Sequence, residues 1–166
     1  MNKKLMMLLL VLLCCFLYCG CGKRNMFNSV VVSNNYSFKE DFLLTHKTYG
    51  AFLDGHIISD DKYPKEITII IKNEQELLET FDSFPDVNFC EKMVCIHGFT
   101  ATVNDVYYLD EVILENNSLI INYGNKKTNK KKPPENSKPD TKWFIVILDR
   151  IEVDNAKFSY LGYINW

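Results

Sequence analysis

The chain has 166 residues, enough for one domain of ordinary size, with 47% hydrophobic residues and a formal net charge of −2 at pH 7. This slightly acidic balance argues against nucleic acid as the main partner, because the phosphate backbone is bound chiefly by lysine and arginine. Aromatic residues make up 13% of the chain, and together with abundant isoleucine and valine they favour half-buried β-strands.

The chain begins with the features of an export signal. Lys3 and Lys4 precede an apolar run, residues 5–18, which has the length of a secretory signal segment and is short for a membrane span. Gly20 then stands directly before Cys21, and a hydrophilic stretch follows. This arrangement resembles the lipobox of bacterial lipoproteins, in which a small residue precedes the cysteine that is diacylated and becomes the mature N-terminus. The resemblance implies lipid attachment at Cys21 and an anchor on the outer face of a bacterial membrane.

Two alternatives to lipidation are an uncleaved anchor helix and a metal site made by Cys19 and Cys21. The metal site is disfavoured because a signal segment offers no further ligands. We therefore predict a lipoprotein signal peptide over residues 1–20, a lipidated tether over 21–28 and one extracytoplasmic globular domain over 29–166. Without residues 1–20, 17 basic residues stand against 21 acidic ones, a net charge of −4.

The first half of the domain contains predicted strands at residues 29–33 and 66–72. Apolar side chains on both sides of the second strand suggest that both of its faces are covered. Residues 42–58 are ambiguous. The clearest helix is predicted over 73–84, with Asn73 as its N-cap, Glu76 completing a capping box and Pro85 closing it. Its apolar stripe is predicted to consist of Leu77, Leu78, Phe81 and Phe84.

The next predicted strand, residues 89–98, contains two cysteines and is a candidate for the centre of the sheet. If Cys90 and Cys95 both lie on this strand, their Cα atoms are about 16 Å apart and their side chains point to opposite faces. A disulfide needs Cα atoms within about 7 Å, so it would require Cys90 to lie in the turn before the strand. Buried reduced thiols are the preferred interpretation, with a disulfide and a metal site as alternatives.

The second half of the domain is predicted to be mostly strand. Residues 106–124 are predicted to form a hairpin around a polar turn at 115–118. Residues 125–142 combine three prolines and many lysines with almost no apolar side chain, which predicts a long exposed loop. Strands are predicted again at 143–153 and 157–165, paired as a hairpin across Asp154 and Asn155. About seven strands and one helix predict an α+β fold with a mainly antiparallel sheet.

The order of these segments resembles a known family over residues 66–150. The matching positions are Glu76-Leu77-Leu78, then Val87-Asn88-Phe89 with Lys92-Met93-Val94, then Val112–Ile121 and Trp143–Leu148. They resemble the C-terminal domain of the protease-complex subunit PrcB, a recurring domain of small bacterial lipoproteins. The resemblance implies a non-catalytic accessory domain on a cell-surface lipoprotein.

No catalytic site, cofactor site or metal site is predicted. His56 stands near Asp54, Asp60 and Asp61, but Asp-Gly and Asp-Asp pairs are ordinary in turns. His97 is expected to follow the buried strand and to pair poorly with Cys95, and no third group marks a nucleophile pair. The sequence contains no Gly-rich phosphate loop, serine nucleophile motif or helical histidine pair.

Two segments near the C-terminus offer possible contact residues. The lysines of the predicted loop suit an anionic lipid or wall polymer, or they simply keep the loop solvated. The aromatic residues of the last segment suit a glycan or protein partner, or they form the core face of a last strand. The possible contact residues are Lys126, Lys127, Lys130, Lys131, Lys132, Tyr160, Tyr163 and Trp166.

An export signal without a catalytic pattern favours a domain that is displayed outside the cytoplasm over an enzyme. We expect a cell-envelope lipoprotein whose domain binds or scaffolds another envelope protein, uses no cofactor and does not bind nucleic acid. The alternative is a lipoprotein that binds a wall glycan or another anionic envelope polymer. A hydrolase that uses His97 or Cys95 is the third hypothesis.

Overall fold

The computed structural model describes residues 27–33, 35–59, 61–102, 106–125 and 138–163, and every structural statement below concerns these residues. They form a mainly antiparallel β structure with two short helices, which agrees with the broad α+β prediction. The elements in chain order are β1 (Ser29–Val32), β2 (Ser37–Phe38), α2 (Glu40–Thr45), β3 (Phe52–Leu53), β4 (His56–Ile57), β5 (Glu66–Ile71), α3 (Glu74–Thr80), β6 (Phe81–Ser83), β7 (Lys92–Ala101), β8 (Tyr107–Glu115), β9 (Ser118–Asn125), β10 (Asp140–Asp149) and β11 (Asn155–Tyr163).

A four-stranded antiparallel sheet has the order β1-β10-β7-β5. Strand β7 is central, as predicted, and its residues 93–98 are all buried. The strand begins later than predicted, at Lys92, because residues 89–91 form a turn. A strand that is apolar on both sides needs cover on both faces of its sheet. Both faces of this sheet are in fact covered.

A three-stranded sheet, of order β11-β9-β8, covers one face. The predicted hairpin of residues 106–124 is confirmed: β8 and β9 pair antiparallel around a two-residue turn. Asn116 and Asn117 in this turn have φ of 48° and 61°, the left-handed conformation that a tight hairpin of this kind requires. Asparagine adopts this conformation more readily than most residues.

The predicted hairpin between 143–153 and 157–165 is wrong. Strand β10 pairs with β1 and β7 in the four-stranded sheet, whereas β11 pairs parallel with β9 in the three-stranded sheet. The segment between them passes from one sheet to the other, with Val153 buried on the way. Phe158 of β11 is 4% exposed and stacks on His97 of the opposite sheet. Pairing β11 with β9 therefore buries the Phe158 ring between the two sheets, which a hairpin with β10 would not do.

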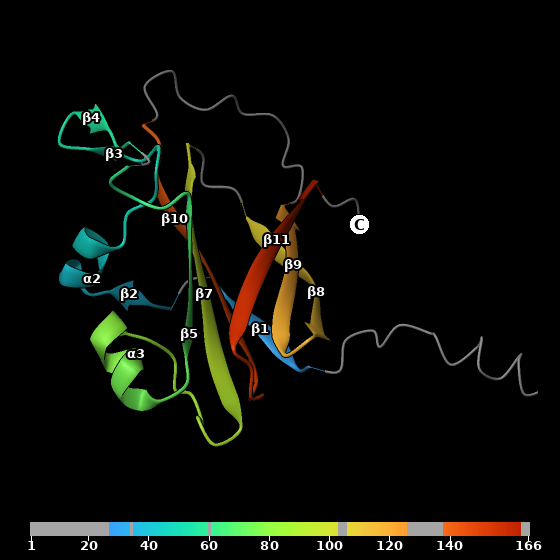
Figure 1. Cartoon of the computed structure of the whole chain (residues 1–166). Helices are drawn as coiled ribbons and strands as arrows, with labels where there is room; N and C mark the ends of the chain where they lie inside the picture. The colour runs from blue at the N-terminus through green and yellow to red at the C-terminus, as the bar shows by residue number, and fades with distance from the viewer. Residues whose placement is uncertain (1–26, 34, 60, 103–105, 126–137, 164–166) are drawn as a thin grey trace, which may run out of the picture.

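The two sheets pack face to face around an aromatic and aliphatic core. Figure 1 shows the four-stranded sheet in the middle, with the three-stranded sheet on one side and the two helices on the other. Met93 and Cys95 of β7, Ile121 of β9 and Phe144 of β10 are buried between the sheets. One edge is closed, because β11 contacts β5 across the layers. At the other edge, β1 and β8 lie opposite each other without pairing.

The outer face of the four-stranded sheet is covered by α2, α3 and the small β2-β6 pair. The predicted helix of residues 73–84 is too long at its C-terminal end, since α3 stops at Thr80 and Phe81 begins β6. Phe81 is 3% exposed and packs on Phe38 of the paired strand β2, with ring centroids 4.6 Å apart. Leu78 is 58% exposed, so it does not belong to the predicted apolar stripe.

The predicted start of this helix is confirmed. The Glu76 amide donates a hydrogen bond of 2.9 Å to the side-chain oxygen of Asn73, which is the N-cap. The Glu76 carboxylate accepts in return from the Asn73 side chain and from the amide of Lys72. This reciprocal arrangement is a variant of the capping box and holds α3 at the end of β5.

Several predicted segments lie partly or wholly outside the described residues. These are the signal peptide, nearly all of the tether and residues 126–137 of the lysine-rich loop. At the ends of that loop, Asn125 is the last residue of β9 and β10 begins at Asp140. In the part of the chain that the structure describes, no helix is long and apolar enough to cross a membrane.

Candidate functional site

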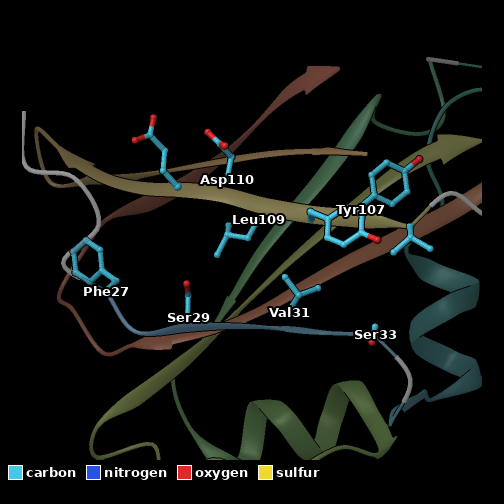
Figure 2. Close-up of a pocket in the computed structure, with 10 residues that line it drawn as sticks. Phe27, Ser29, Val31, Ser33, Tyr107, Leu109 and Asp110 are labelled. Atoms are coloured by element: carbon cyan, nitrogen blue, oxygen red, sulfur yellow. The ribbon is translucent and has the colours of Figure 1, made fainter. Parts of the chain in front are cut away.

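A groove opens between the two edge strands that face each other without pairing. It has a volume of about 440 Å³, within the usual range for ligand sites. Figure 2 shows β1 along one wall and β8 along the other, with Leu109 directed toward β1. Residues from two segments of the chain line it: Phe27, Ser29, Val31, Ser33, Val106, Tyr107, Tyr108, Leu109, Asp110 and Glu111.

A β-bulge in β8 shapes one wall of this groove. Leu109 pairs with Tyr123 and Glu111 pairs with Asn122, so Asp110 is an extra residue with no partner on β9. Leu109 faces the core before the bulge, and Val112 faces it after the bulge. In a regular strand, residues three apart would point to opposite faces. The bulge therefore corrects the phase of the apolar residues and leaves two consecutive acidic residues at the rim.

The groove combines an apolar floor with a polar, acidic rim. Phe27, Val31, Tyr107 and Leu109 are half-buried and pack against the core between the sheets. At the rim, one Glu111 carboxylate oxygen accepts a hydrogen bond of 3.0 Å from Asn122. Asp110 is exposed. Such a site favours a ligand with apolar groups and a positive charge.

The two groups that the sequence raised as possible nucleophile and base lie in the core instead. The expected position of His97 after the strand is wrong. His97 lies within β7 on the same inner face as Cys95, because residues two apart on a strand share a face. Its ring stacks on Phe158, with centroids 4.7 Å apart and planes 7° apart.

The surroundings of this pair favour the neutral forms. Burial lowers the pKa of His97 to about 4, and burial raises the pKa of the Cys95 thiol to about 12. A thiol must ionise to act as a nucleophile, so this environment does not activate Cys95. His97 keeps polar contacts with the backbone of Ile67 and, at 3.5 Å from its Nδ1, with the Thr68 hydroxyl.

Both described cysteines are free. Cys95 is buried as expected, but Cys90 lies exposed in the turn before β7. In the described ranges, no cluster of three or more histidine, cysteine, aspartate or glutamate residues is suited to hold a metal ion. His56 is exposed on β4, and its neighbour Asp60 lies outside the described residues.

Most of the predicted contact residues are not described by the structure. Cys21, Trp166 and the five lysines at 126, 127, 130, 131 and 132 lie outside it, and only the backbone of Tyr163 is described, at the end of β11. Tyr160 is 51% exposed, and its hydroxyl donates a hydrogen bond of 2.6 Å to Asn125. The structure therefore places one of these side chains, Tyr160, on the surface of the three-stranded sheet.

The groove itself was not predicted from the sequence. Residues 106–114 carry no signal for the bulge, because every position of 106–109 and of 112–114 is apolar or aromatic and the two runs show no alternation. Comparison with known proteins finds no family model, no curated protein and no solved structure that matches the chain. The site is therefore interpreted from its own geometry.

Proposed function

We propose that this protein is an exported, lipid-anchored lipoprotein whose domain binds another envelope protein and performs no chemistry. The open groove between β1 and β8 is the observation that carries the binding part of this proposal. It is the place where two edge strands leave apolar side chains half-buried beside a polar, acidic rim. Edge strands of this kind are ready surfaces for another chain.

The non-catalytic part of the proposal is supported by where the reactive groups lie. In the described part of the chain, no histidine or cysteine lines the groove, and the inner core holds both Cys95 and His97 in their neutral forms. Acid–base or nucleophilic catalysis needs such groups within hydrogen-bond reach of a substrate. The resemblance to the PrcB accessory domain is consistent with this proposal and stays a prediction.

The tether connects the groove to the proposed lipid. Phe27 lines the groove and lies six residues after Cys21. Six residues span at most about 20 Å when fully extended. If Cys21 carries the lipid, one end of the groove therefore lies within about 20 Å of the acylated residue, at a height where another membrane-anchored protein would meet it.

Site-specific photo-crosslinking on intact cells tests the proposal. A photoreactive amino acid replaces Val106, which is 50% exposed at the groove, or Leu78, which is 58% exposed on α3 in the opposite layer. We expect a discrete crosslinked protein from the Val106 position and none from the Leu78 position. No product at Val106, or the same products from both positions, contradicts binding at the groove.

In parallel, the Cys21→Ser variant should lose label from a clickable fatty acid and leave the detergent-extracted membrane fraction.

A second function is supported by the aromatic end of the domain. Tyr160 and Leu161 are 51% and 49% exposed on β11, a surface that suits a wall glycan. Together with the lysines at 126, 127, 130, 131 and 132, this surface would bind an anionic envelope polymer. Replacing the five lysines by glutamine should then abolish retention on purified cell wall. Unchanged retention ends this second hypothesis.

A further inference from the structure

The free edge of β1 presents backbone groups that are not used inside the sheet. The Asp149 amide donates a hydrogen bond of 3.2 Å to the Asn28 carbonyl, which makes this a hydrogen-bonded pair of the antiparallel ladder. Such pairs alternate along a ladder, and the register places Val30 in the next one. The N–H and C=O groups of Ser29 and Val31 therefore point away from β10, toward the open edge.

The side chains of the same two residues line the groove. Residues 29, 31 and 33 line it from β1 and the residue that follows, whereas Val30 is 66% exposed. Figure 2 shows Ser29, Val31 and Ser33 in a row facing the strand that carries Leu109. A strand added beside β1 would continue the sheet and place every second side chain over this apolar floor.

The two edges of the groove are protected differently against such an addition. The bulge at Asp110 interrupts the edge of β8 and puts a charge on it, two devices that discourage strand pairing. Strand β1 has the sequence Ser-Val-Val-Val, with neither charge nor proline, and only its short length limits pairing. Addition of a strand is therefore favoured at β1.

The acidic residues at the rim favour an added strand that carries a positive charge. Asp110 and Glu111 line the groove, and among the residues that the structure describes no lysine, arginine or histidine does so. In Figure 2, Asp110 lies on β8 near Ser29, with its carboxylate directed away from β1. A basic side chain opposite Ser29, long enough to lie across the edge of β8, reaches this acidic rim.

We infer that the groove binds an extended, basic segment of a partner protein, which adds as a strand to the free edge of β1. This inference rests on the proposed protein-binding function and names the chemistry of the partner: alternating β-formers with a lysine or arginine toward the Ser29 end. A second copy of this chain is the competing occupant, and the experiment distinguishes the two.

The test uses the full chain in detergent micelles and three capped synthetic peptides, followed by NMR of backbone amides. The first peptide is Thr-Val-Thr-Lys-Thr-Val-Thr, the second has glutamate in place of lysine, and the third carries N-methyl groups on alternate amides. We expect the lysine peptide, at millimolar concentration, to shift the amide signals of Ser29 and Val31. The glutamate peptide should bind about fivefold more weakly or worse, and N-methylation of the amides that face β1 should abolish binding.

Two matched variants locate the contact. Proline is tolerated at the first residue of a strand, and Ser29→Pro removes an N–H group that makes no bond to β10. Ser29→Pro should weaken binding of the lysine peptide about tenfold, whereas Ser29→Ala, which keeps the N–H group, should leave this affinity unchanged. The double variant Asp110→Asn, Glu111→Gln should bind the lysine and glutamate peptides equally.

The outcomes separate this inference from the function on which it rests. No shift at Ser29 and Val31, equal binding of the N-methylated peptide, or a preference for glutamate overturns strand addition of a basic segment. If the Val106 position still gives a discrete crosslinked protein in that case, the groove binds a protein in another way and the proposed function holds. A Ser29-dependent dimer in sedimentation without peptide shows that a second copy occupies the edge, and it also overturns the inference.

Discussion

The indole ring of Trp143 lies across Gly98 on the neighbouring strand, so closely that a Cβ atom at Gly98 would stand 2.6 Å from the ring. The two residues are paired in the register of β10 and β7. Trp143 in turn contacts Phe38 and Phe42, with ring centroids 5.0 and 5.4 Å away. The missing side chain of Gly98 thus provides the space in which the aromatic layer of the outer face sits on the sheet.

Gly98→Ala is expected to destabilise the fold, because the new methyl group must displace the ring from its packed position. Overpacking of this kind costs about 1–3 kcal/mol of unfolding free energy. Urea unfolding followed by tryptophan fluorescence measures the loss. In a Trp143→Leu background, the same substitution should cost much less. An equal cost in both backgrounds would show that the ring is not the cause.

His97 should make stability depend on pH. Its pKa is about 4 in the folded state because of burial, against an ordinary value of 6.5 for histidine. Between these values the unfolded chain binds a proton that the folded chain does not, so stability falls as the pH is lowered from 7 to 4. The full loss is about 3 kcal/mol. Unfolding free energies of the wild type and of His97→Phe should show a flatter profile in the variant. A profile as steep in His97→Phe as in the wild type would show that another group causes the pH dependence.

Deletion of Asp110 should keep the fold and turn β8 into a regular strand without a bulge. Without this residue, Leu109 and Val112 become two positions apart and share the inner face of a regular strand. We expect stability within about 1 kcal/mol of wild type. Deletion of Ile113 from the same strand is the matched control, since it should turn the apolar residues beside it to the wrong face and destabilise far more. Equal losses for both deletions contradict the assignment of the bulge.

The stability of the protein should depend strongly on the residue at position 116, in the turn between β8 and β9. Its φ of 48° suits asparagine or glycine, and a β-branched residue is strained there. Asn116→Gly should be nearly neutral, whereas Asn116→Val should cost about 1–2 kcal/mol in urea unfolding. Asn117 is a less clean choice, because its side chain also donates a 2.8 Å hydrogen bond to Asp154. A small effect of valine would show that the turn has another conformation.

The two described cysteines should react at very different rates. Cys90 is exposed, whereas Cys95 is completely buried and burial raises its thiol pKa to about 12. A thiol reagent should therefore modify Cys90 in the folded protein and Cys95 only when the fold opens. Cys90→Ser and Cys95→Ala identify the two labels by mass spectrometry. Rapid labelling of Cys95 under native conditions, or no free thiol at Cys90, contradicts the structure.

Local features of the fold were predictable because their causes lie within a few residues. Asn73 and Glu76 cap α3, and the two asparagines of the β8-β9 turn adopt left-handed conformations. Alternating and continuous apolar runs predicted most strands and the mainly antiparallel sheet. In each case the residue types act on neighbouring backbone groups, whatever the rest of the chain does.

The tertiary structure alone decided the partners of those strands. Nothing near Asp154 shows that β11 pairs with β9 rather than with β10, since the choice depends on burying Phe158 against His97 of the opposite sheet. The end of α3 depends likewise on Phe81 reaching Phe38. The groove follows from the same non-local choices: it exists because β1 and β8 become the edges of two stacked sheets, and an edge is a property of the whole arrangement.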